Sequence, residues 1–268
     1  MREKSRGPAR PERMRVLRLA FLITLAVALI AIAPSGALAG WTKGTFQSDG
    51  KPVEEYHCTP ADAGAHPAVI LLHGLSLPGG GNQTFEQICT DLAAQGYFAE
   101  FIEFYSQTGQ GTRTTDNRYY QIWLAEIRSG LDALDSNPGV DPRRVAMMGF
   151  SLGAFLSLTT GARNPGKLAA IVDYYGALPA PFHSGVRNLP PTLILHGAKD
   201  KLVPVARAYA LDLMMTDAGM AHEIHIYPDA QHGFNFPEMQ AWYNPADAHD
   251  AWNRTVAFLA KYLTAPSK

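Results

Sequence analysis

Short, uninterrupted apolar runs alternate with longer amphipathic segments along most of this chain. The runs Ala68–Leu72, Val145–Phe150 and Thr192–Leu195 are typical of parallel strands that are buried on both faces of a sheet. Thr84–Gln95 and Tyr119–Asp135 instead carry their apolar residues at helical spacing. The alternation predicts repeated strand–helix–strand units, and therefore a mostly parallel sheet.

The rest of the chain extends this pattern. Asp49-Gly50 is typical of a hairpin turn and separates the first two predicted strands. The sequence therefore predicts a three-layer α/β fold, with helices on both faces of the sheet. Further strands are predicted at Thr42–Ser48, Val53–Cys58, Tyr97–Phe101, Ala169–Tyr174 and His222–Tyr227, and further helices at Leu152–Ala162, Val205–Ala218 and Ala246–Leu263.

The first 39 residues differ from the rest. Seven Lys and Arg and two Glu lie within residues 1–18, and the 15 residues Leu19–Ala33 carry no charge. With the small residues of Ala37-Leu38-Ala39 behind them, they match a secretory signal peptide. No amphipathic face of a buried helix can be drawn on the apolar run, and it is shorter than the roughly 20 residues that a membrane anchor needs. We expect cleavage after Ala39, which leaves residues 40–268 as a single secreted or periplasmic domain.

Cleavage there changes the charge of the protein. The whole chain has 23 Lys and Arg against 24 Asp and Glu, whereas residues 40–268 retain 16 basic and 22 acidic side chains, a net charge of −6. This balance disfavours nucleic acid as a partner. We also expect no stable membrane span after cleavage. The oligomeric state is not indicated.

Cys58 and Cys89 are the two cysteines, and both lie in the predicted mature part. An oxidising compartment favours a disulfide between them, but two separately buried thiols fit the sequence as well. Neither cysteine has a partner at metal-ligand spacing, so no metal site is predicted.

The segment Gly149-Phe150-Ser151-Leu152-Gly153 joins a predicted strand to a predicted helix. A nucleophilic serine on such a sharp turn needs small neighbours, and the helix N-terminus behind it favours developing negative charge. Ser151 is therefore the candidate nucleophile.

Asp200 and His232 each follow a later strand of the predicted sheet. The carboxyl ends of parallel strands meet at one edge, so both side chains can converge on Ser151. The chain order Ser, Asp, His is the one expected of this hydrolase architecture. His232 is the candidate base, and Asp200 is the candidate residue that orients it.

Other histidines and acids compete for these roles. His73 and His196 stand in His-Gly turns, where a packed, hydrogen-bonded side chain is the alternative interpretation. Asp173 lies inside a strand, and Asp229 comes one turn too early in its loop. The tetrahedral oxyanion needs two donors. We expect the backbone N–H groups of Leu152 and of Leu75, or of a residue directly beside Leu75, to supply them.

With these residues, the chain from about Pro67 to Leu263 resembles the dienelactone hydrolase family of α/β-hydrolases. The resemblance implies an esterase-type hydrolase that acts on a small-molecule ester with water, uses Ser151, His232 and Asp200, and needs no cofactor. It is carried by His73-Gly74, Gly149–Ala154, His196–Asp200, Leu202-Val203-Pro204, Tyr227-Pro228 and His232-Gly233-Phe234.

The sequence departs from the founding lactone-cleaving members of that family. Those enzymes use a cysteine nucleophile and a glutamate in the first oxyanion loop, where this chain has Ser151 and His73-Gly74. Dienelactone itself is therefore not the expected substrate. The resemblance suggests Arg207 as a ligand for a substrate carboxylate; the alternative is a solvated helix residue.

Two other functions remain open at this point. Similar triads cleave amides, so a serine peptidase related to the prolyl oligopeptidases is one alternative. A non-catalytic binding module on a hydrolase fold is the other, because a fold does not fix a function.

Overall fold

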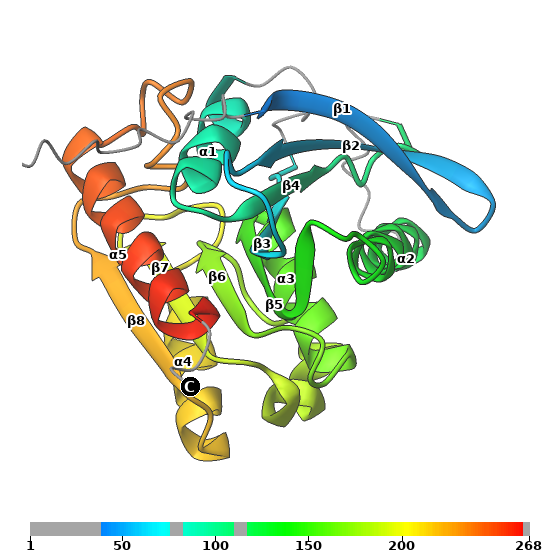
Figure 1. The fold of residues 1–268 in the computed structure, drawn as a ribbon. Coiled ribbons are helices and arrows are strands. Elements are labelled where there is room, and N and C mark those ends of the chain that lie inside the picture. Colours follow the sequence, from blue (N-terminus) through cyan, green and yellow to red (C-terminus); the bar gives the residue numbers. More distant parts are fainter. Residues whose placement is uncertain (1–38, 76–82, 110–116, 265–268) are drawn as a thin grey trace, which may run out of the picture. The chain divides into compact units, whose positions relative to one another are not determined.

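The computed structural model describes residues 39–75, 83–109 and 117–264 (Figure 1). All of them belong to one compact unit, Ser35–Lys268. The predicted signal peptide, except for Ala39 at its end, lies outside the described residues. Among the helices in these ranges, none combines the length and the apolar character that a membrane span requires.

An eight-stranded sheet forms the centre of this unit, in the order β1-β2-β4-β3-β5-β6-β7-β8. β1 pairs antiparallel with β2, and β2 with β4, while every other neighbouring pair is parallel. The predicted mostly parallel sheet is therefore confirmed. The strands are β1 (Ala39–Ser48), β2 (Lys51–Thr59), β3 (His66–Leu72), β4 (Phe98–Ile102), β5 (Val140–Phe150), β6 (Ala170–Tyr174), β7 (Thr192–Gly197) and β8 (His222–Tyr227).

Helices cover both faces of the sheet, which confirms the three predicted layers (Figure 1). Helices α1 and α5 pack on one face, and α2, α3 and α4 pack on the other. The helices are α1 (Gln83–Ala94), α2 (Asn117–Leu134), α3 (Leu152–Arg163), α4 (Ala206–Ala218) and α5 (Pro245–Leu263), with a 3₁₀ segment η1 (Ala180–Asn188).

The apolar runs explain why both faces are covered. Successive side chains of a strand point to opposite faces. In β3, Val69 and Leu71 join the core beneath α1 and α5, whereas Ile70 and Leu72 join the core beneath the other three helices. A run with no polar position therefore requires a helical layer on each side.

Two elements differ from the sequence-based expectation. β5 begins at Val140, five residues before the predicted start, because Val140 pairs with His66 of β3; the polar residues 141–144 then form an irregularity, and the pairing resumes between Val145 and Ala68. The predicted loop Gly176–Pro191 contains η1, whose helical period is obscured in the sequence by Pro181 and by the flanking Pro179, Pro190 and Pro191. In both cases tertiary packing stabilises a segment that its own sequence does not favour.

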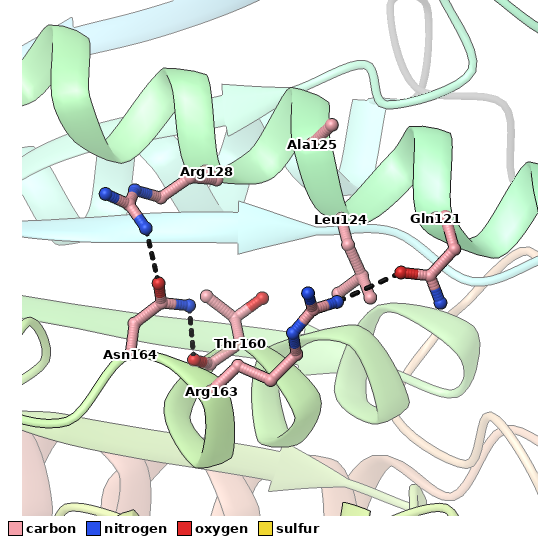
Figure 2. A pocket seen from close by; sticks show the side chains of 7 residues that line it. All are labelled: Gln121, Leu124, Ala125, Arg128, Thr160, Arg163 and Asn164. Atoms are coloured by element: carbon pink, nitrogen blue, oxygen red, sulfur yellow. Dashed lines mark hydrogen bonds between the residues drawn. The ribbon is translucent and has the colours of Figure 1, made fainter. Parts of the chain in front are cut away.

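A polar groove lies between α2 and α3 (Figure 2). In it, Arg128 donates to Asn164 Oδ1 at 2.6 Å and Arg163 donates to Gln121 Oε1 at 3.0 Å. These bonds tie the C-terminal part of α3 to α2. They help to hold the helix whose opposite end follows Ser151.

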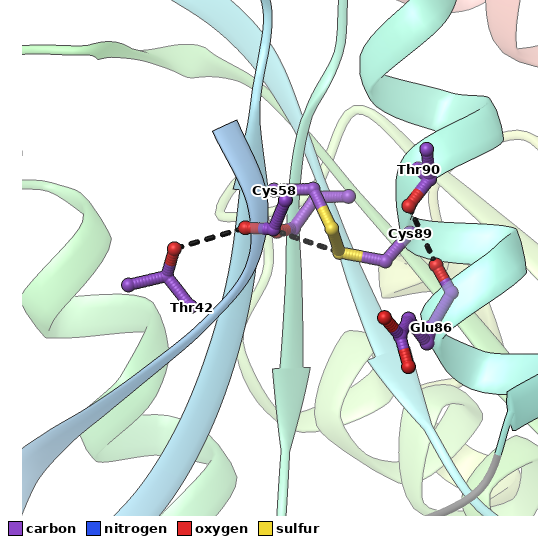
Figure 3. The surroundings of a disulfide bond; sticks show 7 residues. Thr42, Cys58, Glu86, Cys89 and Thr90 are labelled. Atoms are coloured by element: carbon purple, nitrogen blue, oxygen red, sulfur yellow. Dashed lines mark hydrogen bonds between the residues drawn. A yellow bond between two sulfur atoms is a disulfide. The ribbon is translucent and has the colours of Figure 1, made fainter. Parts of the chain in front are cut away.

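Cys58 and Cys89 form a disulfide (Figure 3). Cys58 lies on β2 and Cys89 on α1, with Cα atoms 5.7 Å apart. The bond attaches α1 to the antiparallel edge of the sheet. The alternative of two separate thiols does not describe this structure.

Candidate active site

Ser151 occupies the turn between β5 and α3 in a conformation that L-residues rarely adopt. Its φ is 54° and its ψ is −116°. The Ser151 N–H donates to the carbonyl of Tyr174 at the end of β6. The turn projects the hydroxyl to the carboxyl edge of the sheet, where Ser151 is partly exposed to solvent.

The two glycines beside Ser151 make this turn possible through close packing. A Cβ on Gly149 would lie 2.3 Å from the Gly153 carbonyl oxygen, and one on Gly153 would lie 2.1 Å from that of Leu72. No side chain fits at these distances, so α3 packs against β3 and β5 only with glycine at both positions.

Asp200 and His232 lie in line with Ser151. His232 Nε2 is 2.9 Å from Ser151 Oγ, and His232 Nδ1 is 2.7 Å from Asp200 Oδ2. The carboxylate accepts, so Nδ1 carries the ring proton and Nε2 is free to accept the serine proton. The three candidate residues thus lie in one hydrogen-bonded line, in which His232 contacts both Ser151 and Asp200.

The Asp200 carboxylate is held in its ionised form. Its Oδ1 accepts the N–H groups of Leu202 and Val203 at 2.8 and 2.9 Å. Burial raises the pKa of Asp200, but hydrogen bonds from His196 and His232 outweigh it and hold the pKa below its usual range. A permanent negative charge beside Nδ1 stabilises the imidazolium that forms when His232 takes a proton.

His196 and Asp173 extend the polar line behind Asp200. His196 is fully buried, and its Nε2 lies 2.8 Å from the Val203 carbonyl and 3.4 Å from Asp200 Oδ2. Burial lowers the pKa of His196, but Asp200, the Val203 carbonyl and Asp173 raise it above its ordinary value. The rival acid Asp229 is exposed and pairs with Lys199.

Two backbone N–H groups flank Ser151 at the same edge. Leu152 opens α3, and Leu75 follows β3 and lines the cavity above Ser151. Within the described part of the chain, neither N–H has a hydrogen-bond partner. Both are therefore available as donors to an oxyanion.

The cavity above Ser151 has a volume of about 630 Å³ and a largely apolar wall. Its size suits a small organic ligand. The described residues that line it include no Lys, Arg, Asp or Glu, and Arg207 is exposed on α4 rather than among them. The lining residues are Gly74, Leu75, Phe150, Ser151, Tyr175, Leu202, Val203, His232, Phe236, Met239 and Trp242.

Part of this wall is not predictable from the sequence. Phe236, Met239 and Trp242 come from the irregular segment between β8 and α5. Their only signal is that apolar residues recur, between polar ones, after a candidate catalytic histidine, which also fits ordinary core packing. As for cofactors, the described residues contain no group of three His, Cys, Asp or Glu that could hold a metal ion.

Comparison with known proteins gives a consistent result. The model of the dienelactone hydrolase family matches residues 53–263. A candidate carboxymethylenebutenolidase of Salmonella typhimurium is 29% identical over 249 residues, covering 85% of this chain and 90% of its own length.

Two solved structures are also similar to this chain. A candidate dienelactone hydrolase from Klebsiella pneumoniae has a TM-score of 0.71 at 27% identity, covering 83% of this chain and 98% of its own. Esterase 2 of Thermogutta terrifontis has a TM-score of 0.70 at 20% identity, covering 85% and 97%. At 20% identity, the second likeness concerns the fold alone.

The burial of Asp173 predicts that the free energy of unfolding depends on pH. It is fully buried, and its Oδ2 has no partner among the described residues. Burial raises the pKa of Asp173 to about 6, against the opposing effects of His196 and the Gly176 N–H. The pKa of an aspartate in the unfolded chain is about 3.9. The folded state therefore favours the protonated carboxyl, and the stability that Asp173 contributes is complete below pH ~4 and is lost as the pH rises through ~6.

Asp173→Asn should abolish this loss. Between pH 4 and pH 7.5, the free energy of unfolding of the wild type should fall by roughly 2–3 kcal/mol relative to the variant. Urea denaturation at each pH measures the difference. The exposed Asp229→Asn is the control, and a wild type and Asp173→Asn that change in parallel with pH contradict the prediction.

Proposed function

The chain belongs to the dienelactone hydrolase family of hydrolases, and from this premise we propose that it is a serine esterase, which cleaves carboxylic esters through an acyl-enzyme on Ser151. The observation that carries the proposal is the position of His232 between Ser151 Oγ and the Asp200 carboxylate, at 2.9 and 2.7 Å. A serine hydroxyl becomes a strong nucleophile only with such a base beside it.

In the first half of the proposed reaction, Ser151 Oγ attacks the acyl carbon and its proton moves to His232 Nε2. The carbonyl oxygen becomes an oxyanion, which accepts the N–H groups of Leu152 and Leu75. As the carbon–oxygen bond to the alcohol breaks, His232 returns the proton to the leaving oxygen.

In the second half, water replaces the alcohol. His232 takes a proton from the attacking water, and the Ser151 Oγ–carbon bond breaks to release the acid and restore the hydroxyl. Asp200 stays ionised throughout and balances the charge of the imidazolium. Because the Asp200 carboxylate accepts two backbone N–H groups besides His232, it stays in place while the ring changes charge.

The lining of the cavity favours uncharged esters with an apolar acyl group as the substrates. Phe236, Met239 and Trp242 offer apolar surface, and no cationic side chain stands among the described residues of the wall. A carboxylate placed there would be desolvated without a partner, which is costly. The exposed position of Arg207 favours a solvated helix residue over a substrate ligand.

We further propose that the protein acts outside the cytoplasm after cleavage behind Ala39. The disulfide between Cys58 and Cys89 supports this, because disulfides persist in oxidising compartments. The basic and apolar order of residues 1–39 is the second support.

Replacement of the nucleophile is the first test. Ser151→Ala should lose labelling by a fluorophosphonate probe and lower ester turnover by a factor on the order of 10⁴ or more. Ser157→Ala, on the same helix and outside the cavity, should keep both. Equal labelling of wild type and Ser151→Ala contradicts the assignment.

The substrate class has its own test. 4-Nitrophenyl hexanoate should be hydrolysed with at least about tenfold higher kcat/KM than the monoester of adipic acid, which has the same carbon number and a terminal carboxylate. A preference for the adipate ester contradicts the apolar substrate class. Faster cleavage of an aminoacyl 4-nitroanilide would instead favour a peptidase.

The proposed location is tested on protein expressed with residues 1–39 in a bacterial host. The form recovered from the periplasm or the medium should begin at Gly40 and have no free thiol. An intact N-terminus on an active protein that stays in the cytoplasm contradicts export.

A further inference from the structure

His73 follows β3 directly and is a buried histidine to which the reaction above assigns no role. Its side chain is fully buried. The ring stacks on Phe104 with centroids 4.0 Å apart and planes 6° apart, and Tyr105 meets it edge-on at 4.8 Å. These contacts fix the orientation of the imidazole, so its two nitrogens face fixed partners.

The hydrogen bonds of the ring define where one proton lies. Nδ1 is 2.8 Å from the carbonyl oxygen of Gly74, which can only accept, so Nδ1 carries a proton. Nε2 lies 3.1 Å from Glu103 Oε1, on the opposite side of the ring. A hydrogen bond between Nε2 and Glu103 Oε1 also contains a proton, carried either by the ring or by the carboxyl group. In both cases the proton on Nδ1 stays in its bond to the Gly74 carbonyl.

The bond to Gly74 also sets the direction of the next N–H group. In a trans peptide, the carbonyl of one residue and the N–H of the next point in opposite directions. The Gly74 carbonyl points to His73, which does not line the cavity, whereas Gly74 and Leu75 do. The Leu75 N–H therefore points away from His73, toward the side of the peptide where the cavity lies.

The hydrogen bond from His73 to the Gly74 carbonyl is needed because Gly74 is a glycine beside the nucleophile. A Cβ on Gly74 would lie 3.4 Å from both the Phe150 carbonyl oxygen and Ser151 Cβ, so the peptide runs close beside the nucleophile. Glycine has wide conformational freedom, so the peptide between Gly74 and Leu75 can rotate at low cost. A rotated peptide would present its carbonyl oxygen to the oxyanion and remove one of the two donors.

We propose that His73 is a positioning residue for the oxyanion hole: its Nδ1–H holds the Gly74 carbonyl and thereby aims the Leu75 N–H at the oxyanion. This role rests on the proposed esterase function. The aimed N–H stabilises the tetrahedral intermediate more than the bound ester, because the negative charge on the carbonyl oxygen develops only in the reaction.

Two substitutions of similar size separate positioning from packing. In His73→Asn, the amide nitrogen stands as many bonds from Cα as Nδ1 does and can donate to Gly74. In His73→Leu, a side chain of similar shape has no donor. Circular dichroism and the melting temperature report folding, and if the leucine variant does not fold, His73→Gln replaces it, because its amide nitrogen lies one bond too far.

His73→Leu should lower kcat for 4-nitrophenyl butyrate about 100-fold and leave KM within about threefold, since loss of one oxyanion donor typically costs about 10²–10³ in kcat. Its Ki for a trifluoromethyl ketone, which forms a tetrahedral oxyanion on the serine, should rise by a similar factor. His73→Asn should recover most of both.

Several outcomes overturn the proposal. Full activity of His73→Leu does so, and so does an equal loss in the asparagine and leucine variants. A loss that appears in KM alone has the same meaning. The wild type in parallel keeps the two hypotheses apart: if it does not turn over any ester, the esterase function fails, whereas an active wild type beside an unaffected His73→Leu removes only the role of His73.

Discussion

The backbone conformation of Ser151 is the constraint on which the rest of the site depends. A φ of 54° at a non-glycine residue costs on the order of 1–3 kcal/mol and persists only where the surroundings enforce it. Here the enforcement comes from close packing of α3 on the sheet at Gly149 and Gly153, and from the bond between the Ser151 N–H and Tyr174. In this conformation the Ser151 hydroxyl points out of the apolar core, and the free N–H groups at the start of α3 lie beside it.

Two buried histidines stabilise the loops around this serine in similar ways. His73 follows β3 and bonds the Gly74 carbonyl, while His196 lies near the end of β7 and bonds the Val203 carbonyl. The first bond holds the loop that contains Leu75, the proposed second oxyanion donor. The second concerns the loop whose N–H groups hold Asp200. In each case an imidazole donor satisfies a loop carbonyl next to the apolar sheet, where an unpaired polar group would be costly.

The fold was largely predictable from the apolar runs, because a strand without polar positions needs helices on both faces. The alignment of Ser151, Asp200 and His232 was equally predictable, since each residue follows a predicted strand, and chain order separates Ser, Asp and His. What the sequence did not reveal depends on packing across distant segments. Val140 joins β5 only because His66 of β3 lies beside it, and η1 is obscured by Pro181 and by the prolines that flank it.

The wall of the cavity and the roles of His73 and His196 could not be predicted for the same reason. Nothing local distinguishes Trp242 in a cavity from a tryptophan in the core, and the sequence describes His73 and His196 equally well as packed residues. Their hydrogen bonds to specific carbonyls depend on the fold. The disulfide belongs with them, because the approach of Cys58 to Cys89 depends on how α1 packs on β2.

The central claim is that Ser151 forms a covalent acyl-enzyme with the help of His232. Mass spectrometry of the protein treated with 4-nitrophenyl dimethylcarbamate, whose carbamoyl-enzyme hydrolyses slowly, tests this claim most directly. The account predicts one carbamoyl group per chain, on the peptide that contains Ser151, formed as fast as one equivalent of 4-nitrophenol is released. Release of nitrophenol by an unmodified protein, or a carbamoyl group on another residue, would contradict it.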